Sequence, residues 1–127
     1  MADPTLAVWD AVYQLVSAEL ACEVFDFVPH GANRPHVLMA GVKSAVSDSR
    51  GVRRDICLVD LIAKSAEPGQ HEVLGLIGQI DEALHDKRPN LSTGRPVVFR
   101  IVEKTTAWEA DTESFIGRVT VKCTVEH

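Results

Sequence analysis

Residues 115–126 read FIGRVTVKCTVE, and this stretch decides the fold class. Apolar or small residues occupy every second position, and most of the residues between them are polar. Successive side chains of a β-strand point to opposite faces, so this alternation predicts a strand with one face on a core and the other in water. The more apolar set is Phe115, Gly117, Val119, Val121, Cys123 and Val125.

Three further strand segments precede this one. Residues 96–106 are predicted as a long strand, and the mostly polar segment 107–114 joins it to the last strand as a hairpin. Residues 36–47 and 52–64 are predicted as another hairpin, around the turn-like sequence SDSRG of residues 47–51. Its arms are about a dozen residues long, whereas an ordinary strand has about 5–6. The sequence therefore predicts two long hairpins.

Two other segments carry a helical pattern. Between Pro4 and Leu20 most apolar residues recur at steps of three and four, and Asp3 stands where a helix N-cap is expected. A second helix is predicted from Pro68 to about Asp86, where Pro89 follows as a stop. Its apolar stripe is formed by Val73, Ile77, Ile80 and Leu84, widened by Leu74 and Leu76.

The order of these elements predicts the fold class. A helix is followed by a short extended piece at residues 23–28, then by a hairpin, a helix and the last hairpin. This order indicates an α+β fold: an antiparallel four-stranded sheet made of two long hairpins, with two helices packed on one face. The chain has 127 residues, 46% of them hydrophobic, so we expect residues 1–127 to form a single domain.

Composition limits the function classes. The formal net charge is −5, which argues against tight, sequence-independent binding to nucleic acid, because that binding depends on many Lys and Arg contacts with phosphate. The cysteines, Cys22, Cys57 and Cys123, have neither the count nor the spacing of a disulfide framework or a zinc motif. The N-terminus lacks the pattern of a signal peptide, and no apolar run approaches the roughly 20 residues that cross a bilayer. We therefore expect a protein that folds in the reducing cytoplasm, with protein partners and no membrane.

A search for catalytic chemistry gives little. Residues 75–78, GLIG, lie inside a helical pattern and lack the Lys-Ser/Thr of a phosphate-binding loop. The five histidines are scattered, and no third ligand accompanies His30 and His36 as a metal site would require. Cys57 lies in an apolar run, which favours a buried thiol over a reactive one. We therefore expect no catalytic, metal-binding or cofactor-binding residues.

The residues at two hairpin ends are better explained by assembly with other subunits than by catalytic chemistry. The end of the first hairpin is basic, and the loop of the second is acidic and begins with a tryptophan. Trp and Arg are enriched at interface hot spots, so the two ends could meet between subunits; the alternative is that both are solvated turns. The candidate interface residues are Arg50, Arg53, Arg54, Trp108, Glu109 and Asp111.

Local motifs along nearly the whole chain resemble one known family. Residues 24–29, VFDFVP, form a short aromatic strand that ends in Val-Pro, and residues 35–38, PHVL, follow as a Pro-x-Val strand start. Residues 54–62, RDICLVDLI, form the long second arm, and residues 77–85, IGQIDEALH, end the helix. Residues 117–126 close the chain as a Gly-to-Glu strand. In this order and spacing the chain is similar to the tail-completion, or tail-terminator, proteins of long-tailed phages and gene transfer agents.

The resemblance implies a structural protein rather than an enzyme. It implies a small α+β subunit that closes into a ring, commonly a hexamer, at the head-proximal end of the tail tube. Its partners would be further copies of itself, the tail tube protein and the head–tail connector or neck proteins, with assembly in the host cytoplasm and a final place in the virion or particle tail. DNA would pass through the ring without specific binding, and the resemblance carries over no catalytic residue.

Three other functions remain open at this stage. A different head–tail connector subunit would also be a small α+β protein that forms rings. A small hydrolase or thioesterase-like enzyme would need a polar constellation in a pocket, and a small-ligand binding module would need a closed apolar pocket. A large, concentration-dependent species in solution would favour ring assembly over both of the last two.

Overall fold

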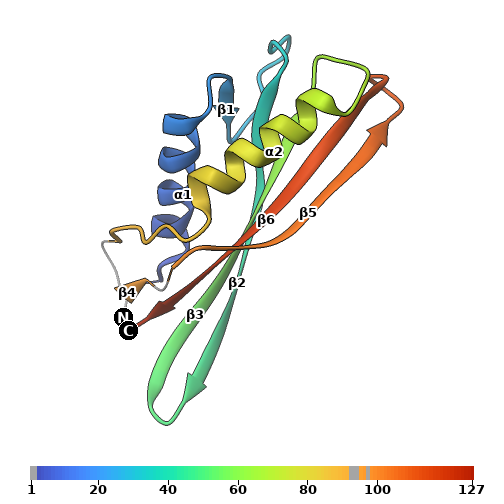
Figure 1. Ribbon diagram of the computed structural model, residues 1–127. Helices are drawn as coiled ribbons and strands as arrows, with labels where there is room; N and C mark the ends of the chain where they lie inside the picture. The colour runs from blue at the N-terminus through green and yellow to red at the C-terminus, as the bar shows by residue number, and fades with distance from the viewer. Residues whose placement is uncertain (1–2, 92–94, 97) are drawn as a thin grey trace.

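The computed structural model describes residues 3–91, 95–96 and 98–127, which contain two helices and six strands (Figure 1). Both long hairpins and both helices of the sequence prediction are present. The elements are α1 (Thr5–Glu19), β1 (Glu23–Phe25), β2 (His36–Ser49), β3 (Val52–Lys64), α2 (His71–Leu84), β4 (Arg95–Pro96), β5 (Arg100–Glu109) and β6 (Ser114–Glu126).

The strands form one sheet in the order β1-β2-β3-β6, with β4 and β5 both on the outer side of β6. β1 runs parallel to β2, and the other pairings are antiparallel. The predicted antiparallel four-stranded sheet is therefore corrected to a mixed sheet of six strands. One of the two added strands, β1, arises because the extended piece after α1 pairs with the start of β2, which gives the backbone around the buried Val24 its hydrogen-bond partners.

The third predicted strand, residues 96–106, is divided in the structure. β4 ends at Pro96 and β5 begins at Arg100, while position 97 lies outside the described residues. Between the two, the buried Phe99 turns its backbone to the segment after α2: its N–H donates to Lys87 O at 2.7 Å and its carbonyl accepts from Asp86 N at 3.0 Å. These two bonds replace pairing with β6. β5 then continues to Glu109, beyond the predicted end.

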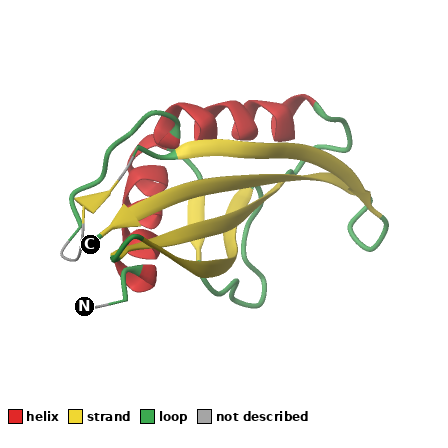
Figure 2. Ribbon diagram, turned by 90° about the horizontal axis from the view of Figure 1, so that it is seen from below, coloured by secondary structure: helices red, strands yellow, loops and turns green. Residues whose placement is uncertain are grey.

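Both helices cover the same face of the sheet, as predicted. Alternate residues of β3 and β6 are buried, which defines one core-facing side, and α1 and α2 contribute their own apolar stripes to the same core cluster. α1 contacts β1, β2 and β3, whereas α2 lies over β6, β5 and β3. In Figure 2, α2 lies along the length of the sheet with the strands on one side of it. The opposite face of the sheet has no helix over it among the described residues.

α1 begins one residue later than predicted: Pro4 occupies the N-cap position in place of Asp3, and Thr5 is the first helical residue. Asp3 Oδ1 accepts hydrogen bonds from Thr5 N at 3.0 Å and from Thr5 Oγ1 at 2.6 Å, which satisfies a backbone donor at the start of the helix. The second helix is shorter than predicted. It ends at Leu84 because His85 is extended and Asp86 has a φ of 62°.

The β2–β3 turn is tighter than the predicted five-residue turn. Arg50 has a φ of 54° and Gly51 a φ of 77°, and the strands pair up to Ser49 and Val52 on either side of them. Two central residues with positive φ give a turn whose twist matches that of the flanking strands. The hairpin therefore remains a regular ribbon to its end.

Candidate functional site

The six candidate interface residues lie on two hairpin ends at opposite ends of the sheet (Figure 1). We call the first the basic tip (Arg50, Arg53 and Arg54) and the second the acidic tip (Trp108, Glu109 and Asp111). Arg54 pairs in register with Glu126 at the end of β6, whereas Trp108 pairs with Phe115 at its beginning. The structure thus groups the residues of each tip but separates the two tips within one chain.

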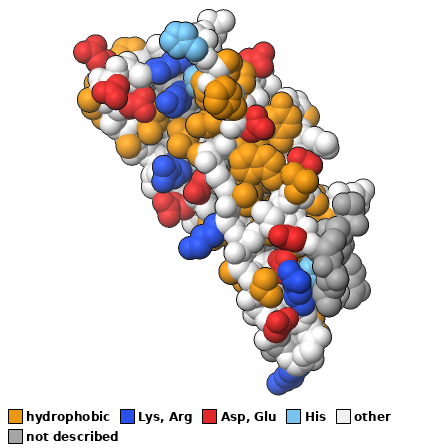
Figure 3. Space-filling view, turned by 180° about the vertical axis from the view of Figure 1, so that it is seen from behind, with side chains coloured by type: hydrophobic (Ala, Val, Ile, Leu, Met, Phe, Trp, Pro, Cys, Tyr) orange, Lys and Arg blue, Asp and Glu red, His pale blue; other side chains and the backbone are white. Residues whose placement is uncertain are grey.

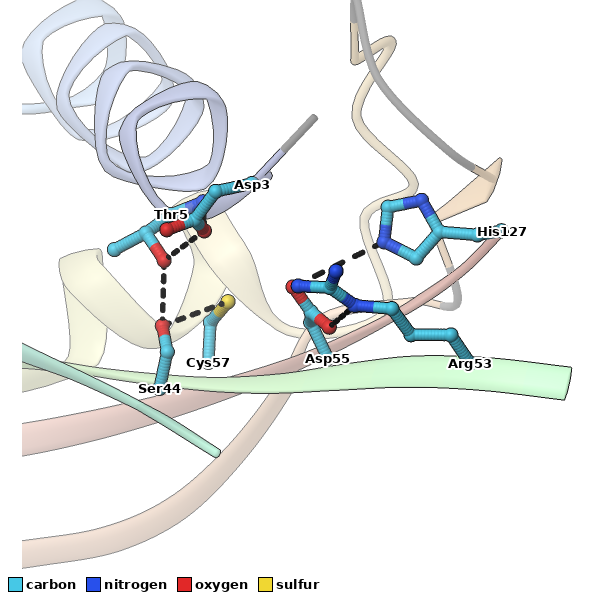
Figure 4. A network of polar contacts seen from close by, with 7 residues as sticks. All are labelled: Asp3, Thr5, Ser44, Arg53, Asp55, Cys57 and His127. Atoms are coloured by element: carbon cyan, nitrogen blue, oxygen red, sulfur yellow. Dashed lines mark hydrogen bonds and ion pairs between the residues drawn. The ribbon is translucent and has the colours of Figure 1, made fainter. Parts of the chain in front are cut away.

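Arg53 is occupied by a carboxylate of its own strand (Figure 4). Its Nε donates to Asp55 Oδ1 at 2.9 Å and a terminal nitrogen donates to Asp55 Oδ2 at 3.1 Å. Asp55 is 1% exposed, and Arg53 supplies two hydrogen bonds to its carboxylate. The hydrogen bond raises the pKa of Arg53 above its ordinary value. The buried His127 adds an Nε2 at 3.9 Å from Asp55 Oδ2. Arg53 therefore stabilises a buried acid instead of presenting a spare charge.

Arg54 is also paired within the chain, with its Nε 3.1 Å from Glu126 Oε1. Across the described part of the chain, Arg50 is the arginine of the basic tip without a carboxylate at ion-pair distance. Arg50 is exposed at the end of the hairpin. A partner protein would therefore meet the charge of Arg50 first.

The acidic tip has a partly packed aromatic ring at its centre. Trp108 contacts Phe115 edge to face, with ring centroids 5.2 Å apart, yet 52% of Trp108 remains exposed. Glu109 lies 3.7 Å from Lys64 Nζ and accepts a hydrogen bond from Thr112 Oγ1 at 2.8 Å. Asp111 is exposed in the turn. The tip thus offers a half-exposed indole next to an exposed carboxylate.

A chain of polar contacts holds the base of the first hairpin against α1 (Figure 4). Thr5 Oγ1, which donates to Asp3, lies 2.8 Å from Ser44 Oγ on β2. Ser44 Oγ in turn donates to Cys57 Sγ on β3 at 3.4 Å. The hydrogen bonds from Thr5 lower the pKa of Asp3, so this carboxylate stays charged at the start of the helix. Sequence reasoning did not find this chain of contacts, because it joins residues 39 positions apart.

Two of the three cysteines, Cys57 and Cys123, are buried and poorly suited to act as nucleophiles. Cys57 is buried, as its apolar neighbours predicted, and lies opposite Cys123 in the register of β3 and β6. Burial raises the pKa of Cys57, and it raises the pKa of Cys123 to about 12. Both thiols are therefore protonated near neutral pH.

The described residues contain neither a cluster of metal ligands nor a helix suited to a membrane. Within residues 3–91, 95–96 and 98–127, no group of three or more His, Cys, Asp or Glu side chains could hold a metal ion. In that same part of the chain, no helix has the length and apolar character to cross a membrane.

Two of the hollows in the described surface lie beside the helices. One of about 600 Å³ lies between β1 and α2 and includes the charged or polar side chains of Glu23, His71 and Glu72. The other, of about 510 Å³, lies between α1 and β2 and has a mainly apolar lining. We call the second the α1–β2 hollow; it is lined by Asp3, Thr5, Leu6, Trp9, Gly41 and Val42.

Comparison with known proteins agrees with the resemblance found in the sequence. The model of the family described as tail completion protein gp17 matches residues 6–126. A chain in the structure titled "Virion of native gene transfer agent (GTA) particle" has the same fold, with a TM-score of 0.86, 17% sequence identity and 100% of each chain covered. No curated protein matches the chain. Because the family model spans almost the whole chain, this protein belongs to the tail completion protein gp17 family.

Proposed function

We propose that the chain is a non-enzymatic ring subunit that ends the tail tube of a phage or phage-like particle and joins it to the head or neck. The match to a tail completion family over residues 6–126 carries this proposal, because it gives the protein a structural role in a phage-type tail. Buried, protonated thiols are in keeping with a role that needs no nucleophile.

The two tips support the joining part of the proposal. A protein that joins a tube to a neck needs two different binding surfaces that face in opposite directions. The basic tip and the acidic tip lie at opposite ends of the sheet and differ in charge and in aromatic content (Figure 1). We infer that each tip contacts a different partner, the tail tube on one side and a connector or neck protein on the other.

The asymmetry of the subunit is compatible with a ring. Identical subunits that use two different surfaces in a head-to-tail contact form a ring when the rotation closes. Six subunits are expected from the family resemblance. The net charge of −5 per subunit is in keeping with a ring through which DNA passes without being held.

The test is assembly of the purified protein, measured by mass determination and negative-stain microscopy over a wide concentration range, alone and with tail tubes. We expect rings of about six subunits, in solution or at the head-proximal ends of the tubes. Rings that bind connectors but leave tubes uncapped would point to another head–tail connector subunit. A protein that stays monomeric with and without tubes would refute the ring proposal.

A further inference from the structure

The outer edge of β2 is open along most of its length. On that side β1 is the sole described strand, and its register covers only His36, Val37 and Leu38. From Gly41 to Ser49, β2 pairs with β3 alone. Unpaired N–H and C=O groups along such an edge are a template for another strand, and proteins commonly protect them with proline, charges or very short strands. This open stretch has no proline and only Lys43 and Asp48 as charges.

A second open edge lies on the other side of the sheet. β5 pairs with β6, and no described strand pairs with its outer side. It has 10 residues, so it matches the open part of β2 in length. Val102, at a register shift in β5, is 51% exposed. At the start of β5, Ile101 N–H donates to His85 Nδ1 at 3.3 Å, so the open part of this edge begins after Ile101. One subunit therefore presents two different edges, on β2 and on β5, with no described strand beside them.

The directions of these two strands suit a ring. β2 is antiparallel to β3, β3 to β6, and β6 to β5, so β2 and β5 run in opposite directions. Rotation about a ring axis along the strands keeps the direction of every strand. The β5 of a neighbouring subunit would therefore meet β2 as an antiparallel partner, which is the slightly more stable pairing.

Exposed charges and exposed apolar side chains both favour pairing of the β2 edge with the β5 edge. Lys43 on β2 and Glu103 on β5 are exposed, point to the sheet face opposite the helices, and have no ion pair in the described part of the chain. Pairing Lys43 with Glu103 of a neighbour places Val102 of that neighbour opposite Ser44, whose own side chain lies on the helix side. There it adjoins the α1–β2 hollow, where Leu6 is 70% exposed and Val42 is 39% exposed.

The geometry points to a ring contact in which β5 of one subunit adds to the open edge of β2 in a second copy of this chain. Backbone hydrogen bonds would supply affinity, while the Lys43–Glu103 pair and the α1–β2 hollow would fix the register. This inference rests on the proposed ring, and it names the surfaces that close the ring. Figure 3 shows that the molecule seen from behind carries charges of both signs among apolar side chains.

Charge reversal tests this contact. Each of the variants Lys43→Glu and Glu103→Lys places like charges on the two paired edges. Each should raise the protein concentration at which half of the subunits are assembled by about tenfold. The double variant, with both changes in one chain, restores opposite charges and should return to within about twofold of the wild type. Lys87→Glu and Glu82→Lys make the same charge changes on exposed residues after and within α2, and should leave assembly unchanged.

Cysteine cross-linking separates the possible outcomes. In a Cys22→Ser background, Lys43→Cys combined with Glu103→Cys should give a covalent ladder that ends at the closed ring, and neither cysteine alone should cross-link. A covalent dimer from Lys43→Cys alone would mean that β2 pairs with β2, which overturns the inference. If the wild type forms rings and both charge-reversal variants form them equally well, the edge contact is overturned and the proposed function stands. If the wild-type protein never assembles, with or without tubes, both the edge contact and the proposed ring function are refuted.

Discussion

Gly117 lets α2 lie close to the sheet. It occupies a core-facing position of β6 under α2, where an added Cβ would lie 2.7 Å from Ile77 Cδ1 and 2.9 Å from Val73 Cγ2. Val73 is branched at Cβ and fully buried, so its side chain cannot rotate away without strain. The separation of helix and sheet at this point is therefore set by the absence of a side chain.

We predict that Gly117→Ala lowers the free energy of unfolding by about 1–3 kcal/mol, because overpacking forces Ile77 or Val73 out of its rotamer. Gly78→Ala is the matched control on the exposed side of α2, where an added Cβ meets nothing within 4 Å. It should raise the free energy of unfolding by about 0.5–1 kcal/mol through helix propensity. Urea denaturation measures both, and equal effects of the two variants would contradict the packing argument.

Single residues also show how far the candidate site could be predicted. The arginines of the basic tip lie at the end of the first hairpin, where the sequence predicted a turn. The pairing of Arg53 with Asp55 was accessible in principle, because residues two apart on a strand share a face. The pairing of Arg54 with Glu126 depends on the register between β3 and β6. No local pattern specifies that register, so sequence alone could not show that Arg50 remains the charge available to a partner.

At the scale of elements, the β2–β3 hairpin contains a local conflict. Its turn needs two residues with positive φ, which Gly51 adopts at no steric cost and which Arg50, with a side chain, does not favour. Asn is the residue most often found before Gly in such a turn. The presence of Arg50 at this sterically unfavourable position fits a use of its charge at the tip.

We therefore predict that Arg50→Asn raises the free energy of unfolding by about 0.5–1 kcal/mol, whereas Gly51→Ala lowers it by about 1 kcal/mol or more. Thermal denaturation checks both values. A loss of joining in the stabilised Arg50→Asn variant would assign the arginine to a partner rather than to the fold. Destabilisation by Arg50→Asn would show that the arginine has a structural role in the hairpin.

Long, strongly patterned elements were predicted from the sequence, and short ones were not. The alternation of residues 115–126 and the helical stripes of α1 and α2 gave the correct types and nearly the correct bounds, because their patterns persist over several turns or residue pairs. β1 has three residues, too few for a pattern, and it is a strand because β2 lies beside it. The break at Phe99 likewise depends on hydrogen bonds to residues 86 and 87, which only the folded chain brings near.

At the scale of the whole molecule, edge pairing determines where the tips point. In a ring closed by β2 and β5, the strands run along the ring axis, although barrel strands tilt from it by about 35–45°. The basic tip and the acidic tip lie at opposite ends of these strands, so they would emerge on opposite faces of the ring (Figure 1). They would then contact the proteins above and below the ring rather than each other within it.

This arrangement predicts that the contact of the ring with the tail tube and its contact with the head or neck can be lost separately. Arg50→Glu changes the unpaired charge of the basic tip, and Asp111→Lys changes the exposed carboxylate of the acidic tip; neither residue lies on the proposed ring contact. Both variants should form rings like the wild type by mass determination. We expect one of them to fail to cap tail tubes, and the other to cap tubes but fail to join them to heads, as seen by negative-stain microscopy. Glu82→Lys is the control for a charge change away from both tips. Loss of the ring itself in either variant would mean that the tips meet between neighbouring subunits, and would place the ring contact at the hairpin ends instead of at the strand edges.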